Sequence, residues 1–548
     1  MASTDKYFLI GIGGTGMRCL EAVTHMCAMG MFDSKEINIL TLDTDFTNGN
    51  KQRTETLIDT YNDIKSTPSS PNGNANNNSF FSAKLNKFQF VTNYSDSGKQ
   101  SFEALTNLKS EGKSGELSEN KLLSDLFLGD AVQQFNLEHG YRAQTHMGSY
   151  LMYHAFIEVA KKLSKGENLS TMERQFGEFL IKLYDAGADA KIFVLGSIFG
   201  GTGASSIPVI PKALNDALKI YDPTMELHPE AKFGATLLTE YFKFKKPDES
   251  QKKDKDNAVI ADSSFFTLNS QAALQFYEAD PTVKKTYKKM YHIGWPIDSE
   301  DFSKGKSESK TITGGEAQKN DCHITEFLCG CAAWDFFNSD SELDVEEASY
   351  LYKAVHYKDG QLDFSFNDFI GKENGLFFAK KFGGFIAFMH LVLSKNNGAD
   401  GDDGVKGLLG RMSEATQAYT ALDSQFTQKL NDYFKSFGYR IESDKVIPGW
   451  LYQIKSTVSG NLIMDDGAFT SDIKELSKLE PGNLFPEKLG YEWPTSSRFS
   501  SNTFDPFIEL LKDEETNPVE EQNVSTTSEK FIAHLYNAIK KSPKKEIN

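Results

Sequence analysis

Two glycine-rich turns in this sequence could hold an anion. The first, GIGGTG, places Gly11, Gly13 and Gly16 directly after an apolar run and before a helical pattern. The second, GGTG, begins at Gly200, after the apolar run 191–197. Glycines allow a tight turn and a close approach of backbone N–H groups to a phosphate, and the helix that follows adds the positive end of its dipole. Each turn therefore predicts a phosphate-binding loop.

Neither turn ends in the Gly-Lys-Ser/Thr of an ordinary P-loop. The charge of a phosphate would therefore be neutralised by helix dipoles, hydroxyl groups and Mg²⁺ rather than by a lysine. The candidate phosphate-binding residues of the two turns are Gly11, Gly13, Gly14, Thr15, Gly16, Gly200, Gly201, Thr202, Gly203, Ala204 and Ser205.

The first turn alone also fits a nicotinamide- or flavin-dependent oxidoreductase. Such an enzyme carries an acidic residue at the end of its second strand to bind the ribose, and Asp43 in LTLDTD occupies that position. A dinucleotide enzyme needs only one glycine turn, however, whereas two strand–glycine–helix units can both contact one polyphosphate. The second turn favours a polyphosphate site and leaves the oxidoreductase as an alternative.

The order of the elements around these turns predicts an α/β fold. Strands are expected at 6–10, 37–45 and 191–197, with a helix over 17–30 between the first two. This βαβ opening predicts a parallel sheet with helices on both faces. Further expected elements are a helix at 148–163 and apolar runs at 232–242 and 289–295. The alternation continues to about residue 297 and defines a domain over 1–297.

The rest of the chain divides into three further regions. A polar stretch, 298–315, leads into 316–337, whose second half is apolar on every side and is expected to form a buried central helix that includes Asn320 near its start. Together with an acidic turn this region spans 298–344. A mixed α+β domain is expected over 345–512, with helices at 383–394 and 421–437 and strands at 439–443 and 450–458.

Two segments are expected to lie outside the packed domains. Residues 63–80 are rich in Ser, Pro, Asn and Gly, which is typical of a mobile insertion. The tail, 513–548, begins with a stretch of disordered composition and ends with a short helix. One stripe of that helix, Phe531, Ile532, Leu535, Tyr536 and Ile539, either packs on the body or binds a protein partner.

The composition limits the compartment and the partners. The 548 residues include 76 acidic and 59 basic side chains, for a net charge of −17, which argues against nucleic acid and against direct contact with an anionic membrane. The five cysteines follow no disulfide or zinc spacing and are interpreted as buried thiols in a reducing compartment. No run of consecutive apolar residues approaches transmembrane length, and the start lacks a signal-peptide pattern, so a cytoplasmic protein is expected, with membrane contact only through a partner.

Four motifs together resemble the tubulin/FtsZ superfamily. FGGTGAS matches the core of the family's signature loop, G-G-G-T-G-[ST]-G, with Phe199 and Ser205 at the first and last glycine positions. GIGGTGMR resembles the first nucleotide loop, and LDTD resembles the N-T-D motif, with Asp43 at the asparagine and Asp45 at the aspartate. GYRAQTHMG resembles the loop that contacts the terminal phosphate. The motifs lie in the family's order, and the resemblance covers about residues 5–345.

The resemblance implies a Rossmann-like nucleotide-binding domain, a long central helix, a divergent α+β C-terminal domain, and GTP or GDP as ligand with Mg²⁺ held through the phosphates. It assigns Arg142 and Ala143 to the terminal phosphate, and Asp45 to the region of the metal. The family's ribose-contacting glutamate falls on Lys245, which leaves Glu240 as a substitute and puts base and ribose selectivity in doubt. Asn320 resembles the asparagine that reads the guanine edge.

In this family, acidic residues after the central helix enter the nucleotide site of the neighbouring subunit and orient a water on the terminal phosphate. The family pattern N-x-D-x-x-[DE] is matched loosely by Asn338 and Asp340, with Glu342 or Asp344 as the last member. These residues also fit an ordinary solvated acidic turn. A rival alignment uses HITEF and makes Glu326 the catalytic acid, but it would place the strand at 289–295 where the central helix belongs.

The resemblance therefore implies a GTPase that assembles head to tail into filaments, with itself as its main partner. Two alternatives remain open. The first is a nucleotide-dependent scaffold that binds without turnover, and the second is the oxidoreductase described above.

Overall fold

The computed structural model describes most of the chain, and every structural statement below concerns the described part. The described residues are 6–33, 35–45, 47–65, 79–92, 100–106, 119–137, 140–141, 143–166, 168–242, 262–295, 315–346, 348–354, 356–358, 361–365, 367, 370–393, 404–412, 419–442, 445–457, 462–464, 467–469, 484, 505–512 and 526–540. Most of the expected insertion, most of 298–315, Arg142 and Lys245 lie outside them.

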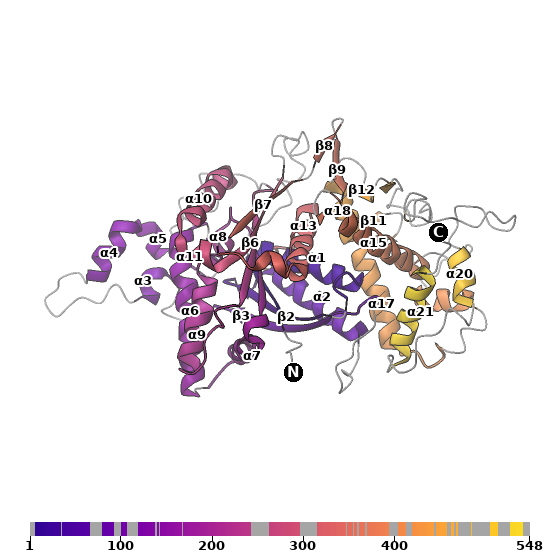
Figure 1. The fold of residues 1–548 in the computed structure, drawn as a ribbon, viewed down its shortest axis with the longest axis horizontal. Coiled ribbons are helices and arrows are strands. Elements are labelled where there is room, and N and C mark those ends of the chain that lie inside the picture. The colour runs from indigo at the N-terminus through magenta and orange to yellow at the C-terminus, as the bar shows by residue number, and fades with distance from the viewer. Residues whose placement is uncertain are drawn as a thin grey trace.

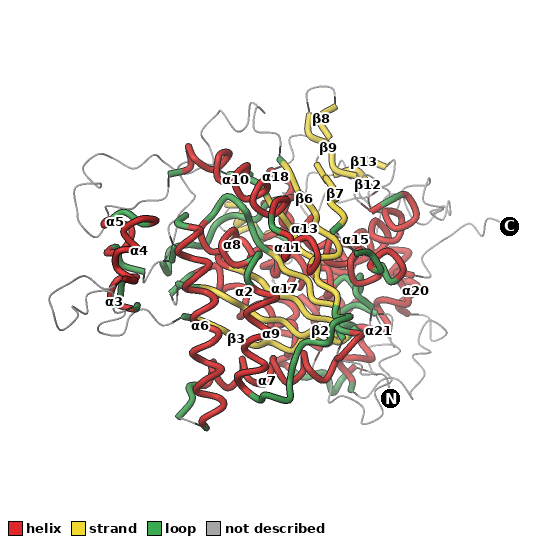
Figure 2. The backbone as a smooth tube through the Cα atoms, turned by 60° about the vertical axis from the view of Figure 1, so that its left-hand side comes forward, coloured by secondary structure: helices red, strands yellow, loops and turns green. Residues whose placement is uncertain are grey.

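The core of the protein is a seven-stranded sheet in which every pair of neighbouring strands is parallel. Its order is β3-β2-β1-β4-β5-β6-β7, and the strands run side by side through the body (Figure 2). Their bounds are β1 Tyr7–Ile12, β2 Glu36–Asp43, β3 Lys84–Val91, β4 Lys191–Leu195, β5 Lys232–Leu238, β6 Tyr287–Gly294 and β7 Ser349–Ala354. The predicted α/β class and parallel sheet are confirmed.

Side chains alternate between the two faces of the sheet, and helices cover both faces (Figure 1). Leu9 of β1 joins one hydrophobic cluster, whereas Phe8 and Ile10 join the other. The first face carries α1 (Gly13–Ala28), α2 (Gly49–Lys65) and α13 (Ile324–Asn338). The second carries α6 (Thr145–Lys165), α7 (Thr171–Ala186), α8 (Gly201–Ser206), α9 (Ile210–Tyr221), α10 (Phe266–Ala279) and α11 (Pro281–Thr286).

The central helix, α13, is buried along nearly its whole length, as its composition predicts. It packs between the sheet and helices of the C-terminal region, where the Phe327 ring lies 5.9 Å from that of Phe382. The helix begins later than expected, because the ring of His323 accepts a hydrogen bond from the N–H of Thr325 and caps it. Asn320 therefore lies in the loop before the helix and not within its first turn.

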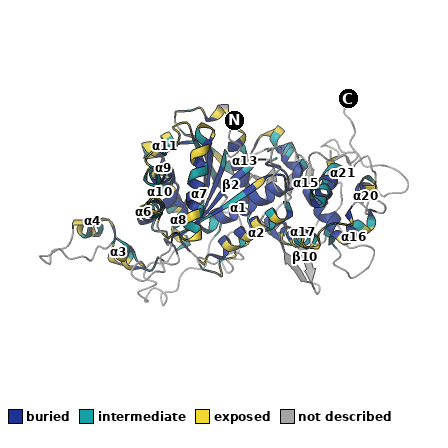
Figure 3. Cartoon of the chain, turned by 90° about the horizontal axis from the view of Figure 1, so that it is seen from below, coloured by how far each residue is buried: buried dark blue, intermediate teal, exposed yellow. Residues whose placement is uncertain are grey.

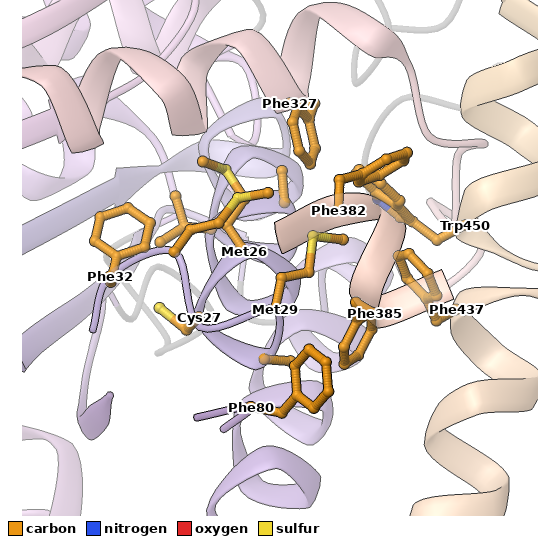
Figure 4. Packing of buried hydrophobic residues seen from close by; sticks show 14 of the residues in the cluster. Met26, Cys27, Met29, Phe32, Phe80, Phe327, Phe382, Phe385, Phe437 and Trp450 are labelled. Carbon is orange, nitrogen blue, oxygen red and sulfur yellow. The ribbon is translucent and has the colours of Figure 1, made fainter. Parts of the chain in front are cut away.

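The C-terminal region packs directly on the first face through α15 (Lys372–Leu393), α17 (Ser424–Phe437), α18 (Trp450–Thr457) and α21 (Thr527–Lys540). Figure 4 shows Phe382, Phe385, Phe437 and Trp450 meeting Met26 and Met29 in one core. The stripe of α21 lies against the body as well, with the Tyr536 ring 5.1 Å from that of Phe80. The remaining helices and strands of the described region are α16 (Gly404–Arg411), α20 (Asp505–Lys512), β8 (His356–Lys358), β9 (Gln361–Ser365), β10 (Tyr439–Glu442), β11 (Lys445–Pro448), β12 (Leu462–Met464) and β13 (Gly467–Phe469).

Two expectations for this region differ from the structure. The strand expected at 450–458 is wrong: Trp450–Thr457 is helix α18, because Trp450 stacks on Phe437 at 5.9 Å and a helix brings Ile454 to the same buried face. The expected domain boundary at 345 also differs from the structure. It would separate β7 from β6, although the two strands pair and β7 is the seventh strand of the sheet.

Helix α15 is the one described helix that is long and apolar enough to cross a membrane. Most of its apolar window, 78%, is buried inside the protein. It is therefore accounted for as a core helix.

A small helical arm stands apart from the body (Figures 1 and 3). It consists of α3 (Phe102–Leu105), α4 (Glu119–Phe127) and α5 (Asp130–Gln134), inserted between β3 and α6. Helix α4 exposes four large apolar side chains, Leu122, Leu123, Leu126 and Phe127, with Leu126 74% exposed. The arm leaves from the carboxyl end of β3 and returns through Leu137, whose carbonyl accepts from the N–H of Gly140 at 3.0 Å.

Candidate functional site

The two predicted glycine turns follow neighbouring strands of the sheet. Gly11 lies within β1 and Gly13 begins α1, while Gly200 and Gly201 follow β4. The chain passes from β1 outward to β2 and β3 and then returns to β4 on the other side of β1, so the order reverses between β1 and β4. In parallel α/β sheets, ligands bind in the crevice outside the carboxyl ends of the strands at such a reversal. The sheet thus places both turns where this class of fold binds its ligands.

Direct contacts join the two turns to the residues that follow β2. The hydroxyl oxygens of Thr44 and Thr202 lie 3.4 Å apart, although 158 residues separate them in the chain. Gly13 has a φ of +63°, and a Cβ at this position would lie 3.3 Å from the Cβ of Thr202. The loops after β1, β2 and β4 therefore converge on Thr202.

The segment 140–148 joins the same group, as the fourth motif predicts. A Cβ on Gly140 would lie 3.3 Å from the Thr44 hydroxyl oxygen. A Cβ on Gly201 would lie only 2.6 Å from the backbone nitrogen of Ala143, which itself has a φ of +64°. An alanine in this left-handed conformation is strained, and such strain gathers at functional sites. We call the convergent loops 11–16, 43–45, 140–141, 143–148 and 200–205 the glycine edge.

Three helices begin at the glycine edge, and among the described residues no N-cap side chain accepts from their first N–H groups. The N-cap residues of α1, α6 and α8 are Ile12, Gln144 and Gly200, and within the described residues none of their side chains caps its helix. The first N–H groups of a helix lack partners inside the helix, and the dipole gives them positive partial charge. An anion seated between these helix starts would accept from backbone donors, in the manner predicted for a site without a lysine.

The two aspartates after β2 are already bonded within the chain. Asp43 is buried, and one of its oxygens accepts from the N–H groups of Thr44 and Asp45 at 2.7 and 3.2 Å. Its other oxygen accepts from the Asn48 side chain at 2.8 Å. Burial, reinforced by the charge of Asp45, raises the pKa of Asp43 to about 7. Asp43 therefore shapes the loop through hydrogen bonds to both of its carboxylate oxygens.

Asp45 fixes a segment that lies across the glycine edge. Its carboxylate accepts from the N–H of Gly315 at 2.6 Å, and the carbonyl of Gly315 accepts from the N–H of Gly49 at 3.1 Å. The segment then brings the Gln318 amide over Gly14, where a Cβ would lie 3.0 Å from the amide nitrogen. Gln318 is therefore a site residue that the sequence motifs did not reveal.

Asn320 lies one step further along this segment. Its N–H donates to the Asn50 side chain at 3.1 Å, and its carbonyl accepts from Arg18 and, at 3.1 Å, from Arg53. The structure thus places Asn320 beside the first turns of α1 and α2, near the first glycine turn. Glu240 lies at the end of β5, where its carboxylate accepts from Thr267 and Ser270 at 2.6 and 3.0 Å.

The candidate catalytic acids lie at the other end of the sheet. We call residues 338–344 the acidic loop; it follows α13, which runs back toward the amino ends of the strands. Asp340 contacts Lys191, the first residue of β4, and Asp344 contacts Lys232, the first residue of β5. Since the five residues of β4 span four steps of roughly 3.3 Å, Lys191 lies about 13 Å from Leu195, the register partner of Gly11 at the glycine edge.

The rival acid, Glu326, forms part of a buried ion pair. Its carboxylate accepts from Arg18 of α1 at 2.5 and 2.8 Å, from the Tyr241 hydroxyl at 2.6 Å and from the N–H of His323 at 3.0 Å. Glu326 is fully buried, so it does not reach a surface that a neighbouring chain could contact. Its bonds instead join α1 to the start of α13.

No protein-family model and no curated protein sequence matches this chain.

A metal at the glycine edge would depend on the phosphates of a ligand. Among the described residues, no group of three or more His, Cys, Asp or Glu side chains could hold a metal ion. Mg²⁺ commonly keeps several waters and is bound by one or two carboxylates together with substrate phosphates. Asp45 would fit that pattern as a single carboxylate that already accepts hydrogen bonds from Thr47 and Gly315, with phosphates supplying the other charged oxygens. The five cysteines are all buried, as the sequence predicts.

Proposed function

We propose that this protein binds a nucleoside triphosphate, GTP, at the glycine edge and assembles head to tail into filaments in the manner of the tubulin/FtsZ superfamily. The observation that carries the proposal is the placement of two complementary groups at opposite ends of one sheet. The four motifs that resemble the family's nucleotide loops converge at the carboxyl ends of the strands, and the acidic loop lies at the amino ends. Neither group can contact the other within one chain.

A head-to-tail contact would bring these two groups together. Such a contact is heterologous and does not close on itself, so it produces an open filament. The acidic loop of one chain would then face the terminal phosphate held by the next. Hydrolysis of a phosphate needs backbone donors, charge neutralisation and an oriented water, and no covalent nucleophile. Asp340 and Glu342 would orient that water, while Mg²⁺ bound through the phosphates and Asp45 would supply positive charge.

The acids are ionised at neutral pH, as this role requires. A hydrogen bond from Lys191 lowers the pKa of Asp340, and one from Lys289 lowers the pKa of Glu342. Ionised carboxylates accept hydrogen bonds from a water and can hold it in one orientation. Each carboxylate already accepts a hydrogen bond from its lysine, which leaves less of it to hold a water. This favours, as the second candidate, a nucleotide-dependent scaffold that binds without turnover.

The exposed arm supports self-association. Apolar side chains gathered on an exposed surface are a mark of protein–protein interaction sites. The arm that carries α4 rejoins the body at the glycine edge, through Leu137 and Gly140. In a head-to-tail filament the arm would reach the neighbouring chain.

The oxidoreductase is disfavoured by Asp43. A carboxylate that binds a ribose hydroxyl must reach the ligand. Asp43 is buried and already accepts three hydrogen bonds inside the chain.

Sedimentation at high speed tests the proposal. The purified chain is incubated with Mg²⁺ and GTP, GDP, ATP, NAD or no nucleotide, and phosphate release is measured in the same samples. We expect pelleting and phosphate release with GTP, and loss of release but retained pelleting in the Asp340→Asn, Glu342→Gln double variant. Unchanged release in that variant would remove the catalytic assignment, and absence of pelleting in every sample would refute the filament.

A further inference from the structure

Three lysines on neighbouring strands lie beneath the acidic loop. Lys191 and Lys232 are the first residues of β4 and β5 and are direct partners in the sheet register. The Lys191 amine lies 2.6 Å from Asp340, and the Lys232 amine lies 2.6 Å from Asp344.

The third amine belongs to Lys289, on the neighbouring strand β6. It lies 2.5 Å from Glu342 and 3.1 Å from Asp335 of α13. Each acid of the loop thus has its own lysine amine, and the three lysines belong to three different strands.

The lysines and the acids differ sharply in exposure. The Lys191 and Lys289 side chains are 7% and 6% exposed, whereas the Asp340 and Glu342 side chains are 84% and 66% exposed. The amines therefore lie behind the loop and the carboxylates face outward. A buried amine is costly unless it is paired and hydrogen-bonded, so each lysine strongly favours a loop position that keeps its acid in contact.

The two buried amines also fix the backbone from which the loop starts. Lys191 donates to the carbonyl of Phe337 at 2.8 Å, and Lys289 donates to the Ser339 hydroxyl at 2.9 Å. Cations at the end of a helix satisfy its last carbonyls and complement its dipole. The end of α13 and the acidic loop are thus held by the same side chains.

We propose that Lys191, Lys232 and Lys289 are positioning residues that hold the acidic loop in the arrangement it presents to a neighbouring copy of this chain. This inference rests on the proposed function. Adjacent strands lie about 4.8 Å apart, so lysines on three successive strands fix the spacing of the carboxylates. Their positive charges also offset the acids, which lets the loop approach a polyphosphate on a chain whose net charge is −17.

The kinetic test compares Lys191→Gln, Lys191→Arg and Lys232→Gln with Lys429→Gln, which removes an exposed ion pair to Asp63 elsewhere on the surface. Phosphate release is measured per sedimented subunit, and GTP affinity is measured on the unassembled chain. We expect Lys191→Gln and Lys232→Gln to lower phosphate release at least tenfold without changing GTP affinity. Lys191→Arg should retain most of the wild-type release, and Lys429→Gln should match the wild type. Release at the wild-type rate in both glutamine variants would overturn the inference.

A second readout does not depend on hydrolysis. Lysine acetylation of the full chain, followed by mass spectrometry, reports how far each amine is protected. We expect Asp340→Asn to speed acetylation of Lys191 and Glu342→Gln to speed that of Lys289, each without affecting the other. Unchanged labelling would refute the lysine–acid bonds alone. A wild-type chain that binds no nucleotide would refute the proposed function, and the positioning role with it.

Discussion

The hydroxyl oxygens of Thr44 and Thr202 lie 3.4 Å apart and join the loop after β2 to the loop after β4. Gly13, on the loop after β1, completes the group, since a Cβ on it would lie 3.3 Å from the Cβ of Thr202. A site built by three loops in contact is sensitive to any atom added between them.

We therefore expect Gly13→Ala to abolish nucleotide binding. The new Cβ would crowd Thr202, and a φ of +63° costs an alanine about 1–2 kcal/mol. Gly166→Ala is the matched control, because Gly166 has the same φ of +63° with no atom within 4 Å of a Cβ. Isothermal titration calorimetry with GTP and thermal unfolding are measured for both variants. Backbone strain is common to the two, so a difference between them reports the crowding of Thr202. Equal GTP affinity in the two variants would show that the glycine edge is not the binding site.

The pKa of Asp43 predicts a pH dependence of stability without ligand. Because the folded pKa of about 7 exceeds that of an unfolded aspartate, the folded state binds the proton more tightly between about pH 4 and pH 7. The contribution of Asp43 to the free energy of unfolding is therefore largest at low pH and is lost as the pH rises to 7. Its size is about 1.4 kcal/mol for each unit of difference between the folded and unfolded pKa values. Urea unfolding at pH 5 and pH 8 should show a smaller decline in Asp43→Asn than in the wild type. An equal decline in both proteins would exclude Asp43 as the source.

Glu326 is expected to contribute to stability rather than to catalysis. Removing its charge leaves the buried Arg18 with backbone carbonyls but no carboxylate as partners, and breaking a buried ion pair costs about 3–5 kcal/mol. Urea unfolding should show this loss in Glu326→Gln, whereas the exposed Glu342→Gln should change stability by no more than about 1 kcal/mol. A Glu326→Gln variant of normal stability that no longer hydrolyses GTP would instead support the rival assignment.

The arm is expected to contribute to assembly. Serine at Leu126 and Phe127 removes exposed apolar area without disturbing a core, so the melting temperature should not change. Sedimentation over a range of protein concentrations should show a higher threshold for assembly. Tyr350→Ser, on the edge strand β7, is the control for loss of an exposed ring. A threshold equal to that of the wild type would place α4 outside the filament contact.

Much of the geometry of the glycine edge could be predicted from local patterns. Apolar runs that end in glycine turns predicted β1, β4 and the helices after them. The apolar run of the strand, the glycines of the turn and the apolar spacing of the helix all lie within one short stretch of sequence. The convergence of the four motifs follows from the parallel sheet, since all carboxyl ends meet at one edge.

Other features depend on contacts between distant residues. The β-branched and aromatic residues of Trp450–Thr457 favour a strand, yet packing against Phe437 and Phe327 makes this segment a helix. Likewise, nothing near Lys191 in the sequence indicates its pairing with Asp340, which lies far along the chain.

The most direct test of the account is a mixing experiment with two inactive variants. Gly13→Ala keeps the acidic loop but loses the glycine edge, and the Asp340→Asn, Glu342→Gln variant keeps the glycine edge but loses the acids. If each site is completed by a neighbour, an equimolar mixture with GTP and Mg²⁺ rebuilds roughly one contact in four. We predict phosphate release in the mixture and none above background in either variant alone. A mixture that stays inactive at every ratio, while the wild type is active, would contradict a site shared between two chains.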